Sequence, residues 1–193
     1  MEVIFIKWEY LLTELVYRRF SRPLARILAK TSITPNTVTI IATIMGLLSG
    51  ILIALGKIYE GVAVLFISQI LDCTDGDLAR ITGRVTRLGA FIDRVFDRFV
   101  DAAIIIGIVA LSPERLWLAG FMAIIGSFGV SISRAMAEAE GAECKVGIGG
   151  RDTRLAIVMA GLLLGYLEAT LWIIASLGFL TTAHRIVHTI RQF

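Results

Sequence analysis

Apolar residues run through the chain in six long stretches that are separated by short polar connections. A helix that spans a membrane needs about 20 mostly apolar residues, and these stretches approach or reach that length. The first begins after Thr34-Pro35, where a capping hydroxyl followed by proline favours the start of a helix. We predict six spans with these approximate bounds: 36–55, 59–82, 88–111, 116–137, 153–167 and 169–187.

The first 33 residues follow a different pattern, in which basic and apolar side chains alternate in short groups. This mixture predicts an amphipathic helix in the membrane interface, with its basic side chains toward the lipid head groups. A soluble helix packed on the cytoplasmic face is the alternative. We therefore predict an all-α integral membrane protein with a single domain over residues 1–193, in which an interfacial arm (1–33) precedes a six-span core (34–193).

Composition and charge support this architecture. Hydrophobic residues make up 56% of the chain and the mean hydropathy is +0.80, values typical of integral membrane proteins. Seventeen of the 19 lysines and arginines fall on one side of the predicted spans, and only Lys57 and Arg115 fall on the other. The positive-inside rule then places both termini and the charged connections in the cytoplasm. The expected environment is the cell membrane, with no nucleic-acid partner.

Four aspartates are paired in helical register on the second and third predicted spans. Asp72 and Asp75 are three residues apart, and Asp93 and Asp97 are four apart, so each pair shares one helix face. The short loop at 83–87 makes these helices antiparallel neighbours, so the two acidic faces can meet. Carboxylates at membrane depth are costly without a cation between them. Oxygen ligands favour Mg²⁺ or Mn²⁺ over zinc; the alternative is a solvated helix end with arginine partners.

Small residues accompany these acids. Gly76, Ala79 and Gly89 carry little or no side chain, which leaves room for a ligand to approach the helix backbone. Arg80 can neutralise a phosphate or pair with an acid. A divalent metal is also what a diphosphate substrate requires. The pattern therefore favours a metal-dependent site for a diphosphate.

The same residues resemble the signature of the CDP-alcohol phosphotransferase family, D-x2-D-G-x2-A-R-x8-G-x3-D-x3-D, at every fixed position. The matching residues are Asp72, Asp75, Gly76, Ala79, Arg80, Gly89, Asp93 and Asp97. The upstream segment TPNTVT (34–39) is similar to the family's entry into its first helix. The interfacial arm and the six spans also match, so the resemblance covers nearly the whole chain.

The resemblance implies a reaction in which a CDP-alcohol donor transfers its substituted phosphate group to an acceptor alcohol and releases CMP. Asp72, Asp75 and Asp93 would hold metal on the donor diphosphate, with Asp97 nearby or sharing it. Asp97 is also the expected general base. The residues expected at the donor are Asn36, Thr39, Asp72, Gly76, Ala79, Arg80 and Gly89. For Asn36 and Thr39, helix capping and packing are the alternative explanations, and nearly as good. The family also implies a homodimer.

The acceptor is predicted from basic residues around the fourth connection. The segments 131–138 and 150–155 resemble, incompletely, those of family members that use inositol phosphate. An anionic acceptor would suit a cluster formed by Arg134, Lys145, Arg151 and Arg154. Alternatively, these residues only mark the cytoplasmic side. We predict a phosphorylated polyol, with inositol phosphate first, and glycerol phosphate or serine as the alternatives; the donor is a CDP-lipid or a CDP-polyol.

Two other classes of membrane protein also place acids in their helices. A metal-ion transporter would distribute its ligands around the midplane and contain broken helices, whereas these acids lie at the cytoplasmic ends of the spans. A polytopic prenyltransferase has a different aspartate pattern without the Gly76-x2-Ala79-Arg80 element. The small-residue pairs Gly46/Gly50 and Gly161/Gly165 allow close helix approach, and we predict that they serve internal packing more than a dimer seam.

Overall fold

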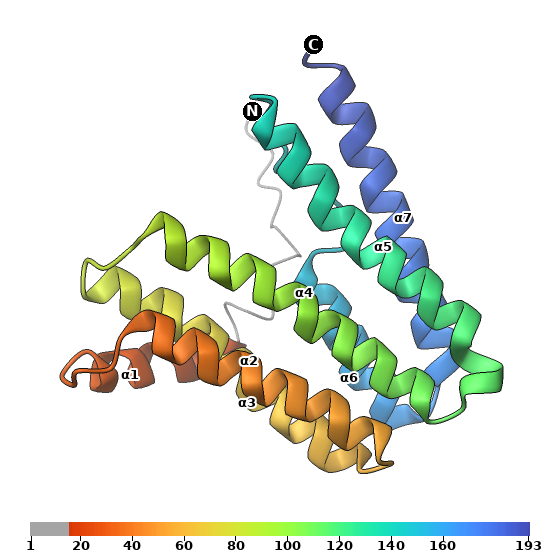
Figure 1. Ribbon diagram of the computed structural model, residues 1–193, viewed down its shortest axis with the longest axis horizontal. Helices are drawn as coiled ribbons and strands as arrows, with labels where there is room; N and C mark the ends of the chain where they lie inside the picture. The colour runs from red at the N-terminus through yellow and green to blue at the C-terminus, as the bar shows by residue number, and fades with distance from the viewer. Residues whose placement is uncertain (1–15) are drawn as a thin grey trace.

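The computed structural model describes residues 16–193, and this part of the chain is entirely helical (Figure 1). Its helices are α1 (Arg18–Leu28), α2 (Pro35–Ala54), α3 (Ile58–Ile81), α4 (Arg87–Ala110), α5 (Pro113–Ala139), α6 (Arg151–Leu164) and α7 (Leu167–Ile190). The predicted all-α class is confirmed over the described residues. Helix α1 belongs to the predicted interfacial arm. The part of the arm that contains Lys7 lies outside the described residues.

Three of the helices are long and apolar enough to cross a membrane, namely α2, α5 and α7. Helices α3 and α4 have similar lengths but carry charged residues in the halves that their loop joins. Helix α6 has 14 residues, about 21 Å at 1.5 Å per residue, which is shorter than a hydrocarbon core of roughly 30 Å. Compared with the approximate bounds predicted for the fifth span, 153–167, the helix begins two residues earlier and ends three residues earlier. Gly165 ends α6 early because it adopts a left-handed conformation with φ of 76°.

Two threonines cap the N-terminal ends of α2 and α4. The Thr34 hydroxyl accepts the Thr37 N–H at 3.2 Å, and Pro35 is the first residue of α2. The predicted start of the first span is confirmed. In the same way, Thr86 caps α4 by accepting the Gly89 N–H at 3.0 Å. These caps satisfy N–H groups that the first helical turn leaves without a partner.

Helix α2 packs against both α3 and α4, whereas α3 and α4 contact each other little. The small residues of α2 make this close approach possible. A methyl group added at Gly46 would lie 2.6 Å from Val100, and one at Gly50 would lie 2.6 Å from the Ala103 carbonyl oxygen. Both glycines therefore serve internal packing, as predicted. The expectation that α3 and α4 are direct neighbours is wrong along most of their length, because each of them packs mainly on α2.

The second half of the described chain is organised around α5 and α7, which lie side by side (Figure 1). They cross where Gly126 of α5 meets Gly178 of α7, and a methyl group at Gly178 would lie 2.7 Å from the Gly126 Cα. Helix α6 contacts α7 and α3, so it connects this half with the helix that carries Asp72 and Asp75. One apolar core joins α3 to α7 and includes Leu65, Ile104, Leu116, Leu155 and Leu171.

Candidate active site

Three of the predicted metal ligands converge. Asp72 and Asp75 of α3 and Asp93 of α4 each offer an oxygen atom, and these oxygens all lie within 4.8 Å of one another. Asp75 is buried, and the other two are partly buried. Helical spacing puts Asp72 and Asp75 on one face of α3, and the end of α4 nearest the connecting loop brings Asp93 to it. The two acidic faces meet, as the sequence predicts.

The chemistry of this group fits a hard divalent cation, because its ligand atoms are all carboxylate oxygens. Helix α2 orients one of them. The Thr39 hydroxyl donates a hydrogen bond to Asp75 Oδ2 and lies 3.2 Å from the Pro35 carbonyl oxygen. Thr39, expected at the nucleotide, thus contacts a candidate metal ligand directly.

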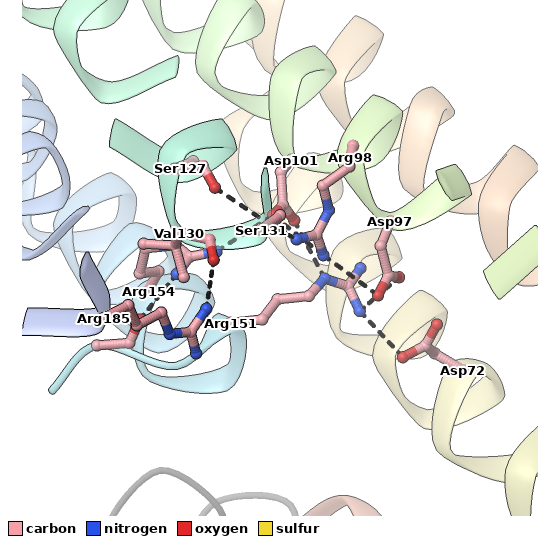
Figure 2. A network of polar contacts seen from close by, with 11 residues as sticks. Asp72, Asp97, Arg98, Asp101, Ser127, Val130, Ser131, Arg151, Arg154 and Arg185 are labelled. Atoms are coloured by element: carbon pink, nitrogen blue, oxygen red, sulfur yellow. Dashed lines mark hydrogen bonds and ion pairs between the residues drawn. The ribbon is translucent and has the colours of Figure 1, made fainter. Parts of the chain in front are cut away.

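Asp97 lies outside this group of three and faces an arginine. Its Oδ1 is 2.7 Å from Arg151 Nη1, and its Oδ2 is 3.4 Å from Arg98 Nη2. The same Arg151 Nη1 donates to Asp72 Oδ2 at 3.0 Å. Figure 2 shows how the Arg151 guanidinium from α6 lies between Asp72 of α3 and Asp97 of α4. Arg151 therefore links one member of the aspartate group to the predicted general base.

Asp101, which was not among the residues predicted from the sequence, is buried one turn beyond Asp97 on the same face of α4. Its Oδ1 accepts a hydrogen bond of 3.1 Å from Arg151 Nε. Its Oδ2 lies 3.5 Å from Arg154 Nη2 and 3.9 Å from Arg98 Nη2. The signal was present, because Asp93, Asp97 and Asp101 continue at intervals of four, but the family signature ends at Asp97.

Two of the four basic residues predicted for the acceptor join this centre. Arg151 reaches three aspartates, and Arg154 is 4% exposed, with its Nη1 donating to the Gly149 carbonyl oxygen at 2.8 Å. Arg134 instead forms an ion pair of 2.7 Å with Glu138 on its own helix, and exposed Lys145 lies 3.8 Å from Glu143. Of these four residues, the two arginines that form ion pairs with the aspartates both come from α6.

Of the glycines predicted at the donor, Gly76 leaves open space beside the acids, whereas Gly89 lies close to its neighbours. Among the described residues, a methyl group at Gly76 would meet only the Arg80 guanidinium, at 3.5 Å. Arg80 is exposed and donates to Asp77 Oδ1 at 2.7 Å. On the α4 side, a methyl group at Gly89 would lie 3.1 Å from Asn36 Oδ1. The end of α3 therefore offers accessible backbone next to the carboxylate group.

Asp77 is not in the group of candidate metal ligands and instead contacts α1. It is buried, and its Oδ2 accepts a hydrogen bond of 2.6 Å from Ser21 of α1. Its other oxygen binds Arg80. Asp77 therefore attaches the described helix of the N-terminal arm to the helix that carries the candidate metal ligands.

A profile described as CDP-alcohol phosphatidyltransferase matches residues 32–184, which is most of the chain. The chain belongs to this family. The prediction of a CDP-alcohol phosphotransferase is thereby confirmed, and the rival transporter and prenyltransferase interpretations lose their support. The match also covers every candidate site residue, from Asn36 to Arg154.

Relatives in this family agree along nearly their whole length. The archaetidylinositol phosphate synthase of Methanothermobacter thermautotrophicus is 36% identical, over 90% of both chains. Two solved structures of the phosphatidylinositol phosphate synthase of Mycobacterium tuberculosis superpose with a TM-score of 0.81. One has CDP-DAG bound, is 28% identical, and is covered over 94% of its length and 89% of this chain. The other, with manganese and citrate, is 29% identical and covered over 88% of both chains.

Proposed function

We propose that this protein transfers the substituted phosphate group of a CDP-linked lipid to a phosphorylated polyol, with inositol phosphate as the first candidate, and releases CMP. One observation carries the proposal: Arg151, beside the buried Arg154, reaches from α6 to the aspartates of α3 and α4. A carboxylate group suited to metal and diphosphate thus adjoins guanidinium groups suited to a second anion. The names of the relatives, and the CDP-DAG in one of them, support the same substrates.

Asp72, Asp75 and Asp93 would hold Mg²⁺ or Mn²⁺, and the manganese in a related structure supports this assignment. When bound, the metal would neutralise the donor diphosphate and stabilise the charge on the departing CMP. Asp97 is proposed to accept the proton of the acceptor hydroxyl, and sharing of the metal by Asp97 stays a prediction. The acceptor oxygen forms a bond to the lipid-linked phosphorus as the bond to CMP breaks.

The remaining residues would hold the two substrates. Gly76 and Ala79 give the donor access to the α3 backbone, and Arg80 lies beside them to contact its phosphates. Asn36, Thr39 and Gly89 border the same space from α2 and α4. Arg151 and Arg154 are proposed to bind the acceptor phosphate; Arg134 and Lys145 remain further candidates.

We also propose the membrane arrangement that was predicted from the sequence. Helices α2 to α7 would form a six-span core in a single domain, and α1 would lie in the interface. The distribution of basic residues supports a site that opens to the cytoplasm. The family resemblance supports a homodimer.

The test of this proposal is CMP release by the purified protein in detergent, with CDP-archaeol or CDP-diacylglycerol as donor. We expect turnover with inositol phosphate to exceed turnover with serine by at least tenfold, because a neutral acceptor leaves the arginines without an anion. Glycerol phosphate is the informative competitor, since it shares the phosphate and differs in the polyol. A clear preference for serine would contradict the proposal.

Substitution of Gly76 tests the donor site separately. We expect Gly76→Leu to abolish detectable donor binding, because a branched side chain would fill the open space between the acids and Arg80. The fold should persist, since within residues 16–193 no helix packs closely against this position. Donor binding is measured by titration with a CDP-lipid, and thermal unfolding checks the fold. The control is Ile51→Leu, because Ile51 lies at an exposed position of α2. Unchanged donor affinity in Gly76→Leu would mean that this glycine has no part in binding.

A further inference from the structure

Asp101 is the point at which three arginines from two helices meet (Figure 2). Arg98 comes from α4 itself, and Arg151 and Arg154 come from the first turn of α6. Their nitrogen atoms lie 3.1 Å (Arg151), 3.5 Å (Arg154) and 3.9 Å (Arg98) from the Asp101 carboxylate. The Asp101 side chain is 7% exposed, so water does little to screen these charges.

Three guanidinium groups so close together repel one another and require a buried counter-charge. Arg151 also has Asp72 and Asp97 as partners, but among the ion pairs of the described residues Arg154 has only Asp101. The Arg98 guanidinium also donates to the Ser131 hydroxyl. Within the part of the chain that the structure describes, Asp101 is therefore the one carboxylate that contacts all three arginines.

The surroundings restrict how these side chains can move. A cavity of only about 10 Å³ remains beside Asp101 and Arg154, and apolar residues such as Ile104, Leu155 and Val158 form its other walls. The Arg154 Nη1 is held by the Gly149 carbonyl oxygen at 2.8 Å. The Arg151 guanidinium is held through Nε by Asp101 and through Nη1 by Asp72 and Asp97. The remaining N–H groups of Arg151, which is 14% exposed, therefore have a defined direction.

We infer that Asp101 is a positioning residue, which holds Arg151 and Arg154 in the orientation that binds the acceptor's phosphate. The inference rests on the proposed function for the identity of that anion. Asp101 is not assigned a contact with either substrate. Its effect would pass through the arginines, so loss of its charge should weaken binding of the acceptor and leave the donor almost unaffected.

The decisive variant is Asp101→Asn, which keeps the shape of the side chain and removes its charge. We expect the KM for inositol phosphate to rise about tenfold or more, in line with the loss of one ordered hydrogen bond to a charged group. The KM for the CDP-lipid should change by less than about twofold. Glu168→Gln is the matched control, because it removes a carboxylate that lies 2.7 Å from Arg115. Glu168 follows the C-terminal end of α6, whereas Arg151 and Arg154 lie in its first turn, so both constants should stay unchanged.

A double-mutant cycle separates positioning from a general effect on the fold. If Asp101 acts through Arg151, the effect of Asp101→Asn should shrink to about threefold or less in an Arg151→Ala background. Independent, multiplicative effects would overturn the inference. So would tighter acceptor binding in Asp101→Asn, because that result would identify Asp101 as a competing anion. If Asp101→Asn does not fold, Asp101→Glu takes its place: it keeps the charge but displaces it, and a normal acceptor KM would overturn the inference.

Calorimetric titration with inorganic phosphate makes the test independent of turnover. We expect wild-type protein to bind phosphate at least tenfold more tightly than Asp101→Asn. Equal affinities, or no phosphate binding to wild type, would overturn the inference. If wild type binds phosphate in this manner but releases no CMP with any phosphorylated polyol, the proposed function fails while the role of Asp101 stands.

Discussion

Removal of divalent cations with EDTA is expected to abolish CMP release, and excess Mg²⁺ or Mn²⁺ to restore it. The physical reason is the group formed by Asp72, Asp75 and Asp93, whose oxygens lie within 4.8 Å of one another and would repel a diphosphate without a cation between them. Metal stabilisation of a phosphoryl-transfer transition state contributes several kcal/mol, so a loss of about 100-fold or more is expected. The measurement is the rate of CMP release against free metal concentration.

Substitution of single ligands should shift that metal dependence. Asp75→Asn is expected to require a higher metal concentration for half-maximal rate, because a neutral amide oxygen replaces a buried carboxylate. Glu143→Gln is the control: Glu143 is an exposed acid outside the group, and its loss should leave the metal dependence unchanged. Full activity in EDTA would contradict the proposed mechanism.

Asp97→Asn is expected to lower turnover by about 100-fold or more, since positioned general bases contribute roughly 10²–10⁴-fold. Donor affinity should remain within a few-fold of wild type, because Asp97 is not in the group of three candidate metal ligands. The measurements are kcat with saturating substrates and direct titration with the CDP-lipid. Thermal unfolding shows whether the loss of a partner for Arg151 affects the fold.

The contact between Asp97 and Arg151, at 2.7 Å, allows a second outcome that must be distinguished. If Asp97 only orients Arg151, Asp97→Asn should raise the acceptor KM and leave kcat nearly unchanged. If Asp97 accepts the proton, kcat should fall even when the acceptor is saturating. Retention of most of the turnover would contradict the assignment of Asp97 as the base.

The sequence predicts the parts of this site that depend on local spacing. Residues three and four apart share a helix face, so the pairing of Asp72 with Asp75 follows from the helices alone. The start of α2 was equally predictable, since Thr34-Pro35 forms a cap from its own side chain. Both features are local, and neither depends on how distant helices pack.

Features that depend on tertiary packing were not predictable in this way. The two arginines of α6 and the basic residues before them looked equivalent in the sequence, and only the contact of α6 with α3 distinguishes Arg151 from Lys145. The contact of Asp101 with Arg151 was not predictable for the same reason, because 50 residues separate the two in the chain. The end of α6 at Leu164 follows from the left-handed backbone conformation of Gly165, which a hydropathy pattern does not register.

The network of Figure 2 and the adjoining aspartates also have a consequence for electroneutrality. Five carboxylates and three guanidinium groups meet here, which leaves a formal excess of two negative charges: Asp72, Asp75, Asp93, Asp97 and Asp101 against Arg98, Arg151 and Arg154. One divalent cation brings this centre to neutrality. A second would leave it positively charged until a diphosphate arrives, so we expect a second ion to bind only together with the donor.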